Sequence, residues 1–306
     1  MNPLLFLAAV LVDRLLGDPP GWPHPVRLIG AALVWLERLA PETPVLRRLF
    51  GAAVTLALAG GSALIVHLLV TLPGVGGLAA LYFAFAGLAL GSLLHEGRTV
   101  LALLESGDLG GARRAVAGLV SRDASGMDAS AVRRALAETV SENFNDGFAA
   151  PLFFLLLGGP ALMWAYKAVS TMDSMWGYRT PRFRDLGWFA ARADDVLAFV
   201  PARLAALALV GAGWMLRRRP VGVWTRIRRD ARRMDSPNAG WPMAAAAWVC
   251  GAGMGGRSVY FGRTVDKPHL GPAGGWDGPH LRLLLRVVSR AGTGLAVAGG
   301  VVLFFF

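Results

Sequence analysis

Two apolar runs separated by a short turn place the strongest constraint on the fold. They cover residues 50–72 and 78–95, and the turn between them, residues 73–77, reads Pro-Gly-Val-Gly-Gly and carries no charge. A helix that crosses a bilayer needs about 20 mostly apolar residues. Arg47 and Arg48 precede the pair. Because basic residues are retained on the cytoplasmic side of a membrane, the two runs predict a transmembrane hairpin with both ends in the cytoplasm.

The composition also indicates an integral membrane protein. Of 306 residues, 55% are hydrophobic and only 17% are charged, and the mean hydropathy is +0.49, which is unusual for a soluble domain. The net charge of +11 is concentrated in arginine runs at 217–219 and 226–233. These follow an apolar segment, as the positive-inside rule expects, so we expect no nucleic-acid partner. The single cysteine, Cys250, excludes an intrachain disulfide.

The sequence therefore predicts an all-α fold, that of a polytopic integral membrane helical protein with short or re-entrant helices. We expect a single membrane domain over residues 1–306, with a small cytoplasmic helical insertion at residues 97–148, the longest polar stretch. The apolar run 148–169 contains Gly-Gly-Pro at 158–160. Proline removes a backbone donor and glycine weakens a helix, so this run predicts two half-helices.

The topology of that run decides which charged residues can meet. A continuous span would place Glu142 and Asp146 on one side of the membrane, and Lys167 and Asp173 on the other. A re-entrant hairpin would return all four to the cytoplasmic face. If these residues form one site, the re-entrant hairpin is the preferred interpretation.

A helix predicted over residues 129–145 carries carboxylates on one face. Glu138, Glu142 and Asp146 recur every four residues, and such hard oxygen ligands suit Mg²⁺. The alternative is a solvated face on which Arg134 and Glu138 form an ordinary i,i+4 ion pair. A functional site is favoured because a segment apolar enough to enter a bilayer follows Asp146 directly. Placing acidic side chains next to a membrane costs free energy, so such residues usually have a function.

Lysine is rare in this chain. Of 31 basic residues only Lys167 and Lys267 are lysines, and a compact ammonium suits a phosphate oxygen better than a broad guanidinium does. Ser170, Thr171 and Ser174 follow Lys167 at helical spacing, so their hydroxyls share its face and could donate to phosphates. The alternatives are that the two lysines remain by chance and that the hydroxyls face neighbouring helices.

Several longer motifs point to a family. In this order and spacing, the following strings resemble adenosylcobinamide-phosphate synthase, the membrane amide ligase of cobalamin biosynthesis: GDPPGWPHPVRLIG, ETVSENFNDGFAAPLFFLLLGGPALMWAYKAVSTMDSMWGY, RADDVLAFVPARL, SPNAGW and YFGRTVDKP. The resemblance extends from Asp13 to about Gly271. The sequence departs from the family pattern at Ser170, where asparagine is common, and at Ser121, where glycine is common.

The resemblance implies an activity and a location. It implies that the protein joins adenosylcobyric acid to (R)-1-aminopropan-2-ol or its O-phosphate, using ATP and Mg²⁺. It also implies a multi-pass protein of the bacterial inner membrane, surrounded by membrane lipid, with its active site facing the cytoplasm. Other membrane-bound late enzymes of cobalamin biosynthesis are expected partners. An ATP-driven ligase of this kind can form an acyl phosphate that the amine then attacks.

Residue type suggests a role for each candidate. The candidate Mg²⁺ ligands are Glu142 and Asp146 with Asp173 or Asp194. Lys167 is expected to contact the nucleotide phosphates, so Lys167, Glu142 and Asp146 are the candidate catalytic residues. The further candidates for cofactor or substrate binding are Ser170, Ser174, Asn143, Asn238, Arg203 and Lys267.

Two other functions stay open at this stage. One is a membrane signalling protein related to a family implicated in β-lactamase induction, without ligase activity; the dense acid and lysine motifs argue against it. The other is a transporter, since broken helices and buried charges are common there. The two halves of the chain show no hydropathy symmetry that would support it.

Overall fold

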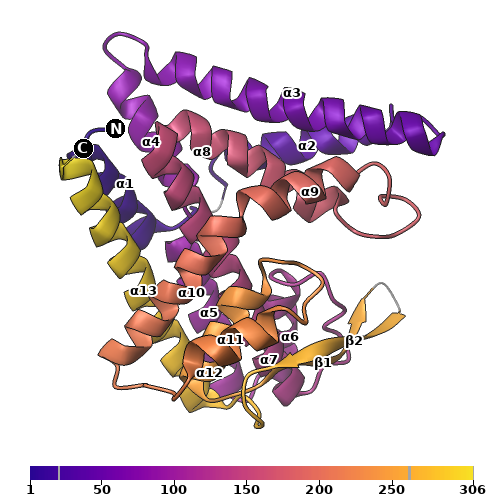
Figure 1. Ribbon diagram of the computed structural model, residues 1–306, viewed down its shortest axis with the longest axis vertical. Coiled ribbons are helices and arrows are strands. Elements are labelled where there is room, and N and C mark those ends of the chain that lie inside the picture. Colours follow the sequence, from indigo (N-terminus) through magenta and orange to yellow (C-terminus); the bar gives the residue numbers. More distant parts are fainter. Residues whose placement is uncertain (20, 261–262, 306) are drawn as a thin grey trace. The chain divides into compact units, whose positions relative to one another are not determined.

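The computed structural model describes residues 1–19, 21–260 and 263–305. Within these residues the regular secondary structure is helical apart from one two-stranded antiparallel sheet (Figure 1), which confirms the predicted all-α class. The chain divides into two compact units. Unit 1 consists of Met1–Ala89, Ala150–Ala198 and Ala298–Phe306, and unit 2 of Leu90–Ala149 and Phe199–Val297.

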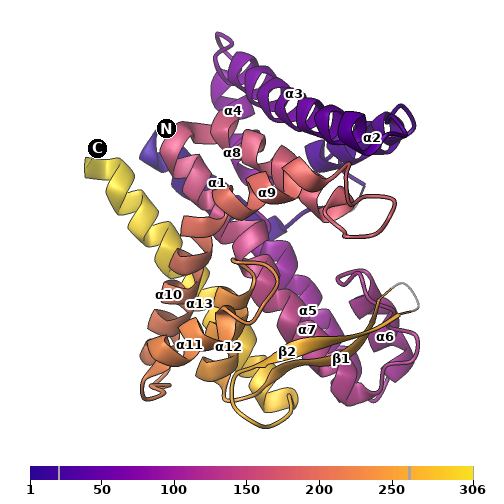
Figure 2. The ribbon, with the colours of Figure 1, turned by 45° about the vertical axis from the view of Figure 1, so that its right-hand side comes forward.

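Unit 1 is built on the long helix α3, which packs against α8 and α9, as Figures 1 and 2 show. In addition, α1 packs against α4 and α2 against α8. The first three helices each begin at a proline, a residue that suits the first turn because its missing N–H has no partner there in any case. The helices of this unit are α1 (Pro3–Leu16), α2 (Pro25–Glu37), α3 (Pro44–Val70), α4 (Gly76–Ala86), α8 (Ala150–Trp176) and α9 (Trp188–Leu197).

Unit 2 has its core around α7. Val132, Leu136, Val140 and Phe144 recur every four residues and are completely buried, so they form one apolar stripe. Helix α7 packs on α5, α6, α12 and β1, and the predicted insertion at residues 97–148 lies within this unit. The elements are α5 (Leu90–Glu105), α6 (Leu109–Ala117), α7 (Ala129–Phe144), the π-helical turn η1 (Asn145–Ala149), α10 (Phe199–Met215), α11 (Val223–Ala231), α12 (Gly240–Cys250), β1 (Met254–Tyr260), β2 (Arg263–Leu270) and most of α13 (Gly278–Phe305).

Among the described residues, four helical segments are long and apolar enough to cross a membrane: Pro44–Val70, Gly76–Glu105, Ala129–Trp176 and Gly278–Phe305. The number rises to five if α9 and α10 count as one bent span. The first two segments correspond to the predicted hairpin. Helix α3 leaves large apolar side chains exposed, among them Leu56, Ile65 and Leu68, as a lipid-facing helix requires.

The predicted interruption of the run 148–169 is confirmed. Gly158 has φ −148° and ψ 22°, and Gly159 has φ 67° and ψ −166°, so neither is helical, although α8 continues on both sides. The positive φ of Gly159 is readily adopted only by glycine, and Pro160 directly follows it. Helix α8 therefore consists of two half-helices joined at this pair of glycines.

The sequence predicts only a polar island over residues 260–268, whereas the structure contains a β-hairpin there. Strand β1 pairs antiparallel with β2, with Gly256 opposite Lys267, and the register shifts at Gly255. Gly255 and Gly256 have φ of 91° and 81°, and a β-bulge that needs such values favours glycine. Phe261 and Gly262, which belong to the predicted island, lie outside the described residues.

Close packing at Gly51 yields a stability prediction for unit 1. A Cβ at this position of α3 would overlap the backbone carbonyl of Leu186, which cannot move aside as a flexible side chain could. We therefore expect Gly51→Ala to lower the free energy of unfolding by about 1–3 kcal/mol. Gly60→Ala is the matched control, because its Cβ meets nothing within 4 Å on the same helix. Thermal unfolding in detergent should show a lower Tm for Gly51→Ala alone; equal Tm values would contradict the prediction.

Candidate functional site

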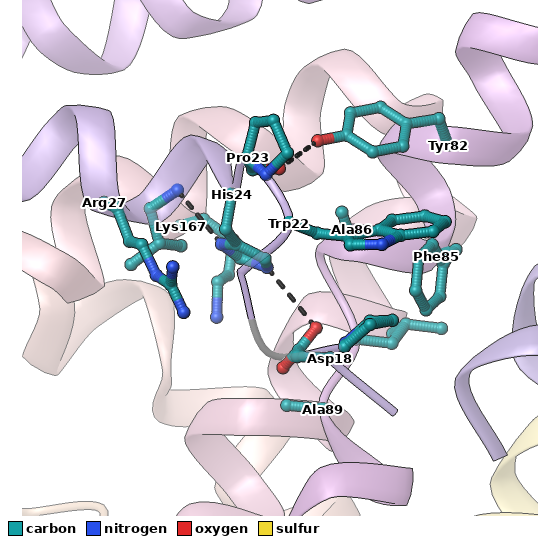
Figure 3. A pocket seen from close by; sticks show the side chains of 13 residues that line it. Asp18, Trp22, Pro23, His24, Arg27, Tyr82, Phe85, Ala86, Ala89 and Lys167 are labelled. Carbon is teal, nitrogen blue, oxygen red and sulfur yellow. Dashed lines mark hydrogen bonds and ion pairs between the residues drawn. The ribbon is translucent and has the colours of Figure 1, made fainter. Parts of the chain in front are cut away.

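A cavity of about 290 Å³ in unit 1 contains Lys167 of α8 (Figure 3). The loop between α1 and α2 forms one wall, and α4 supplies aromatic side chains to another. Figure 3 shows the basic side chains of Arg27 and Lys167 beside His24, with Tyr82 and Phe85 across from them. The other residues that line the cavity include Asp18, Trp22, Pro23, Val26, Ala86 and Leu88.

His24 organises the loop wall. Its Nδ1 accepts a hydrogen bond of 3.3 Å from the backbone N–H of Val26 and so caps the start of α2. An accepting Nδ1 is unprotonated, which places the ring proton on Nε2. Nε2 lies 3.5 Å from Oδ1 of Asp18, a separation at which the two groups attract each other without forming a well-made hydrogen bond. The Tyr82 hydroxyl donates to the carbonyl of Pro23 at 2.8 Å and ties the loop to α4.

The charges in this cavity suit an anionic ligand. Lys167 is half-buried and Arg27 is exposed, so the two cations differ in how far water screens them. Asp18 supplies one carboxylate at the same wall. Two cations around a hollow can bind phosphate or carboxylate oxygens, with the lysine as a point charge and the arginine as a planar fork.

The predicted residues after Lys167 have a different environment. The Thr171 hydroxyl donates to the Lys167 carbonyl at 2.6 Å, and the Ser174 hydroxyl donates to the Ser170 carbonyl at 2.9 Å. Both hydroxyl protons are therefore used in hydrogen bonds to the backbone of the same helix. Toward any other group, the two hydroxyls can act only as hydrogen-bond acceptors. Ser170, Ser174, Asp173 and Asp194 do not line the cavity around Lys167.

In unit 2, Glu138 is the centre of a buried polar cluster. It forms an ion pair with Arg122, and its Oε1 accepts a hydrogen bond of 2.8 Å from the backbone N–H of Gly255. Arg122 also donates to the Ser258 hydroxyl at 3.1 Å. The pairing of Glu138 with Arg134, considered from the sequence, does not form, because Arg134 instead donates to the backbone carbonyl of Arg257 at 3.0 Å. Glu138 therefore joins α7 to the loop before it and to the hairpin, whose strand β1 lies beside α7 (Figure 2).

Glu142 lies one turn further along α7 and is half-buried. Lys267 of β2 lies close enough to interact electrostatically with its carboxylate. The structure thus brings together two candidates to which the sequence analysis gave separate roles. Asp146 is also half-buried, and its Oδ1 accepts a hydrogen bond of 2.7 Å from the Asn145 side chain within the π-helical turn. Such turns are frequent at functional sites.

Arg203 and Asn238 are partners in unit 2. The Arg203 guanidinium donates to Oδ1 of Asn238 at 2.8 Å and lies 3.5 Å from the ring centroid of Phe199 and 4.8 Å from that of Trp241. The SPNAGW motif forms the turn that carries Asn238, with the Ser236 hydroxyl accepting from two backbone N–H groups. The Asn143 side chain donates to the Thr139 hydroxyl at 2.9 Å.

The predicted metal ligands are divided between the units, with Glu142 and Asp146 in unit 2 and Asp173 and Asp194 in unit 1. Among the described residues, no three His, Cys, Asp or Glu side chains are grouped so as to hold a metal ion. Mg²⁺ is commonly held by only one or two carboxylates together with substrate phosphates. Glu142 and Asp146 supply carboxylate oxygens, the donor type that such a site uses.

Sequence reasoning did not single out Asp18, Arg27 or Arg122 as site residues. The signal for the first two was present, since both lie within the motif GDPPGWPHPVRLIG at residues 17–30. For Arg122 the local sequence does not indicate the partner, because Glu138 lies 16 residues away, beyond an intervening loop.

The fold and these clusters define a polytopic helical membrane protein with lysine, arginine and carboxylate groups gathered next to its apolar helices. The protein family described as CobD/Cbib protein matches residues 6–287 of this chain. The chain therefore belongs to the CobD/CbiB family, the adenosylcobinamide-phosphate synthase family that its motifs resemble, and its role is in cobalamin biosynthesis.

Individual relatives agree with this assignment. The chain is 40% identical over 275 residues to the cobalamin biosynthesis protein CobD of Geobacter metallireducens, with 87% of this chain and 85% of the relative covered. It is 38% identical over 284 residues to CobD of Listeria monocytogenes serotype 4b, covering 88% and 87%. It is 37% identical over 285 residues to CbiB of Salmonella typhimurium, covering 89% and 88%. No solved structure matches the chain.

Proposed function

We propose that this protein is an ATP-dependent amide ligase that joins adenosylcobyric acid to (R)-1-aminopropan-2-ol or its O-phosphate. The product is adenosylcobinamide or its phosphate. We place the reaction at the cytoplasmic face of the bacterial inner membrane, because ATP is a cytoplasmic substrate and the arginine runs favour retention on that side. The observation that carries the proposal is the cavity in which Lys167 and Arg27 lie beside Asp18 and His24, within a chain of this family.

The proposed chemistry has two steps. A carboxylate oxygen of adenosylcobyric acid attacks the γ-phosphorus of ATP, and ADP leaves, which gives an acyl phosphate. The amine then attacks the acyl carbon, loses a proton and expels inorganic phosphate. Phosphoryl transfer depends mainly on positioning and on neutralisation of charge, which is what lysine and arginine side chains provide.

Each group of residues has a proposed role within its own unit. In unit 1, Lys167 and Arg27 bind phosphate oxygens, and the pair of Asp18 and His24 holds the loop wall in place. In unit 2, Glu142 and Asp146 would hold Mg²⁺, which when bound neutralises negative charge on phosphate oxygens. Lys267 and the pair of Arg203 and Asn238 are proposed to contact substrate phosphate or corrinoid side chains.

A direct assay tests the proposal. Purified protein in detergent is incubated with adenosylcobyric acid, Mg²⁺, ATP and either amine, and the corrinoid product is identified by chromatography and mass spectrometry. If the carboxylate carries heavy oxygen, an acyl phosphate route transfers one labelled oxygen to the released phosphate. Intact adenosylcobyric acid after incubation with ATP and either amine would contradict the ligase function and favour a signalling or transport role.

The contribution of His24 to activity can be separated from its contribution to folding. Asparagine is as good a helix N-cap as any residue, so His24→Asn is expected to keep α2 intact while it removes the imidazole nitrogen that lies near Asp18. We expect the rate of amide formation to fall by roughly 10-fold or more, as for the loss of a positioning contact, with an unchanged Tm. His24→Ala, which also removes the cap, should lower both activity and Tm. Full activity of His24→Asn would mean that the Asp18 contact is dispensable.

A further inference from the structure

A groove in unit 2 is lined by four arginines from two helices. Arg98 comes from α5, and Arg282, Arg286 and Arg290 come from α13; together with Leu101, Leu285 and Ser289 they enclose about 560 Å³. None of these arginines belongs to the proposed ligase site. The three on α13 are spaced by four residues, so they follow one another along a single face of the helix.

The charge of this groove is largely uncompensated. Arg282 forms an ion pair with Glu105 at the end of α5. Among the described residues, no carboxylate forms an ion pair with Arg98, Arg286 or Arg290, and all three are exposed. Guanidinium groups held next to one another repel, so this arrangement favours an anion between them.

Small residues hold the two helices close together beneath the arginines. A Cβ at Gly97 of α5 would lie 2.7 Å from Cδ2 of Leu285 on α13, so a larger residue there would require the Leu285 side chain to shift. At Gly292 of α13, an added Cβ would overlap the side chain of Leu90. The buried side chains of Leu101 and Leu285 form the floor of the groove. The arginines thus surround an apolar contact between the two helices.

The position of the groove along its helices indicates which anion it binds. The segments Gly76–Glu105 and Gly278–Phe305 are both candidate membrane spans, and the arginines lie next to the apolar part of each. Val297, further along α13, is exposed. A ligand with phosphate at the arginines and hydrocarbon along the apolar part of the helix matches both features. Scattered arginines would be enough to orient the protein in the membrane, whereas here they converge on one hollow from two helices.

We propose that this groove binds the phosphate headgroup of an anionic phospholipid. Basic pockets between membrane helices bind such headgroups, and guanidinium forks match phosphate oxygens. The lipid headgroup takes the place of the missing carboxylates, and its acyl chains lie along the exposed apolar surface of α13.

The test compares wild-type protein with the triple variant Arg98→Gln, Arg286→Gln, Arg290→Gln. Delipidated protein in mild detergent is titrated with phosphatidylglycerol or phosphatidylcholine in mixed micelles, and bound lipid is counted by native mass spectrometry. Each arginine near an anionic lipid contributes roughly a fivefold gain, so we expect the triple variant to bind phosphatidylglycerol about a hundredfold more weakly at low salt. The preference of the wild type should also decline as salt is added, because the headgroup is near water.

A matched control carries the same change of charge elsewhere in unit 2: Arg219→Gln, Arg228→Gln, Arg232→Gln, three exposed arginines outside the groove. This variant should retain the wild-type preference for phosphatidylglycerol. Equal binding of both lipids by the wild type, or an equal loss in the two triple variants, would overturn the proposal. So would a groove that takes up inorganic pyrophosphate in the same assay while it does not retain phosphatidylglycerol. Far-ultraviolet circular dichroism and Tm show whether each variant is folded.

Discussion

Replacing Lys167 with alanine is expected to lower the rate of amide formation by about two to three orders of magnitude, as removal of one preorganised charge contact does in other enzymes. Lys167 is half-buried in the unit 1 cavity, so few water molecules can take over its role toward phosphate. The loss should be largest in kcat if the ammonium meets the phosphoryl group mainly in the transition state. The measurement is steady-state production of adenosylcobinamide or its phosphate at saturating ATP.

Two variants make this result interpretable. Lys167→Arg keeps the positive charge but replaces a compact ammonium with a broad fork, so we expect it to recover only part of the activity. Arg38→Ala removes a cation of the same unit that does not line the cavity, and it should leave the rate close to that of the wild type. If Lys167→Ala forms product at the wild-type rate with an unchanged Tm, Lys167 does not belong to the reacting centre.

The second large effect is expected on stability. In Glu138→Gln, the buried guanidinium of Arg122 would lose the carboxylate with which it forms its ion pair; the side chains of Glu138 and Arg122 are only 2% and 6% exposed. Breaking a buried ion pair by removal of one partner costs about 3–5 kcal/mol. The backbone N–H of Gly255 would keep an acceptor in the glutamine, so most of the loss should come from the charge. We expect a clearly lower Tm and faster hydrogen exchange in the β-hairpin.

The exposed pair of Glu105 and Arg282 supplies the control within the same unit. Both of its side chains are about half exposed, at 45% and 52%, and pairs of this kind contribute little because water screens them. Glu105→Gln should therefore leave the Tm nearly unchanged. The double variant Arg122→Met, Glu138→Leu should recover part of the stability lost in Glu138→Gln, since it removes both charges of the buried pair together. A Tm for Glu138→Gln equal to that of Glu105→Gln would show that the buried pair is not stabilising.

Local sequence signals predicted much of the helical fold. The long apolar runs identified α3 and the segment containing α4 and α5, and the Gly-Gly-Pro at 158–160 located the break in α8. These features depend on composition and on residues that are neighbours in the chain. The β-hairpin was missed because its strands are polar and rich in glycine, and because its pairing with α7 depends on contacts between Gly255 and Glu138, which are far apart in sequence.

The candidate site was predictable to a smaller extent. The rarity of lysine singled out Lys167 and Lys267, and each of them does lie beside charged groups, in the unit 1 cavity and next to Glu142 respectively. Helical periodicity placed Glu138 and Glu142 on the same face of a helix, but it could not show which of them has a structural role. Only tertiary contacts show that Glu138 is enclosed by Arg122 and Gly255. The Mg²⁺ ligands, the ATP site and the amine substrate stay predictions.

The break at Gly158 and Gly159 has a consequence for how Lys167 is aimed. In an uninterrupted helix, each residue is rotated by about 100° around the helix axis relative to the residue before it. The direction of every side chain is therefore fixed by the number of residues that precede it in the helix. Because Gly158 and Gly159 are not helical, this regular rotation stops at them. The orientation of the half-helix that begins at Pro160 is therefore independent of the number of residues in the half-helix before it. Insertion of one residue into the half that precedes the break should therefore leave the direction of Lys167 unchanged, whereas the same insertion after Pro160 should turn it away from the cavity.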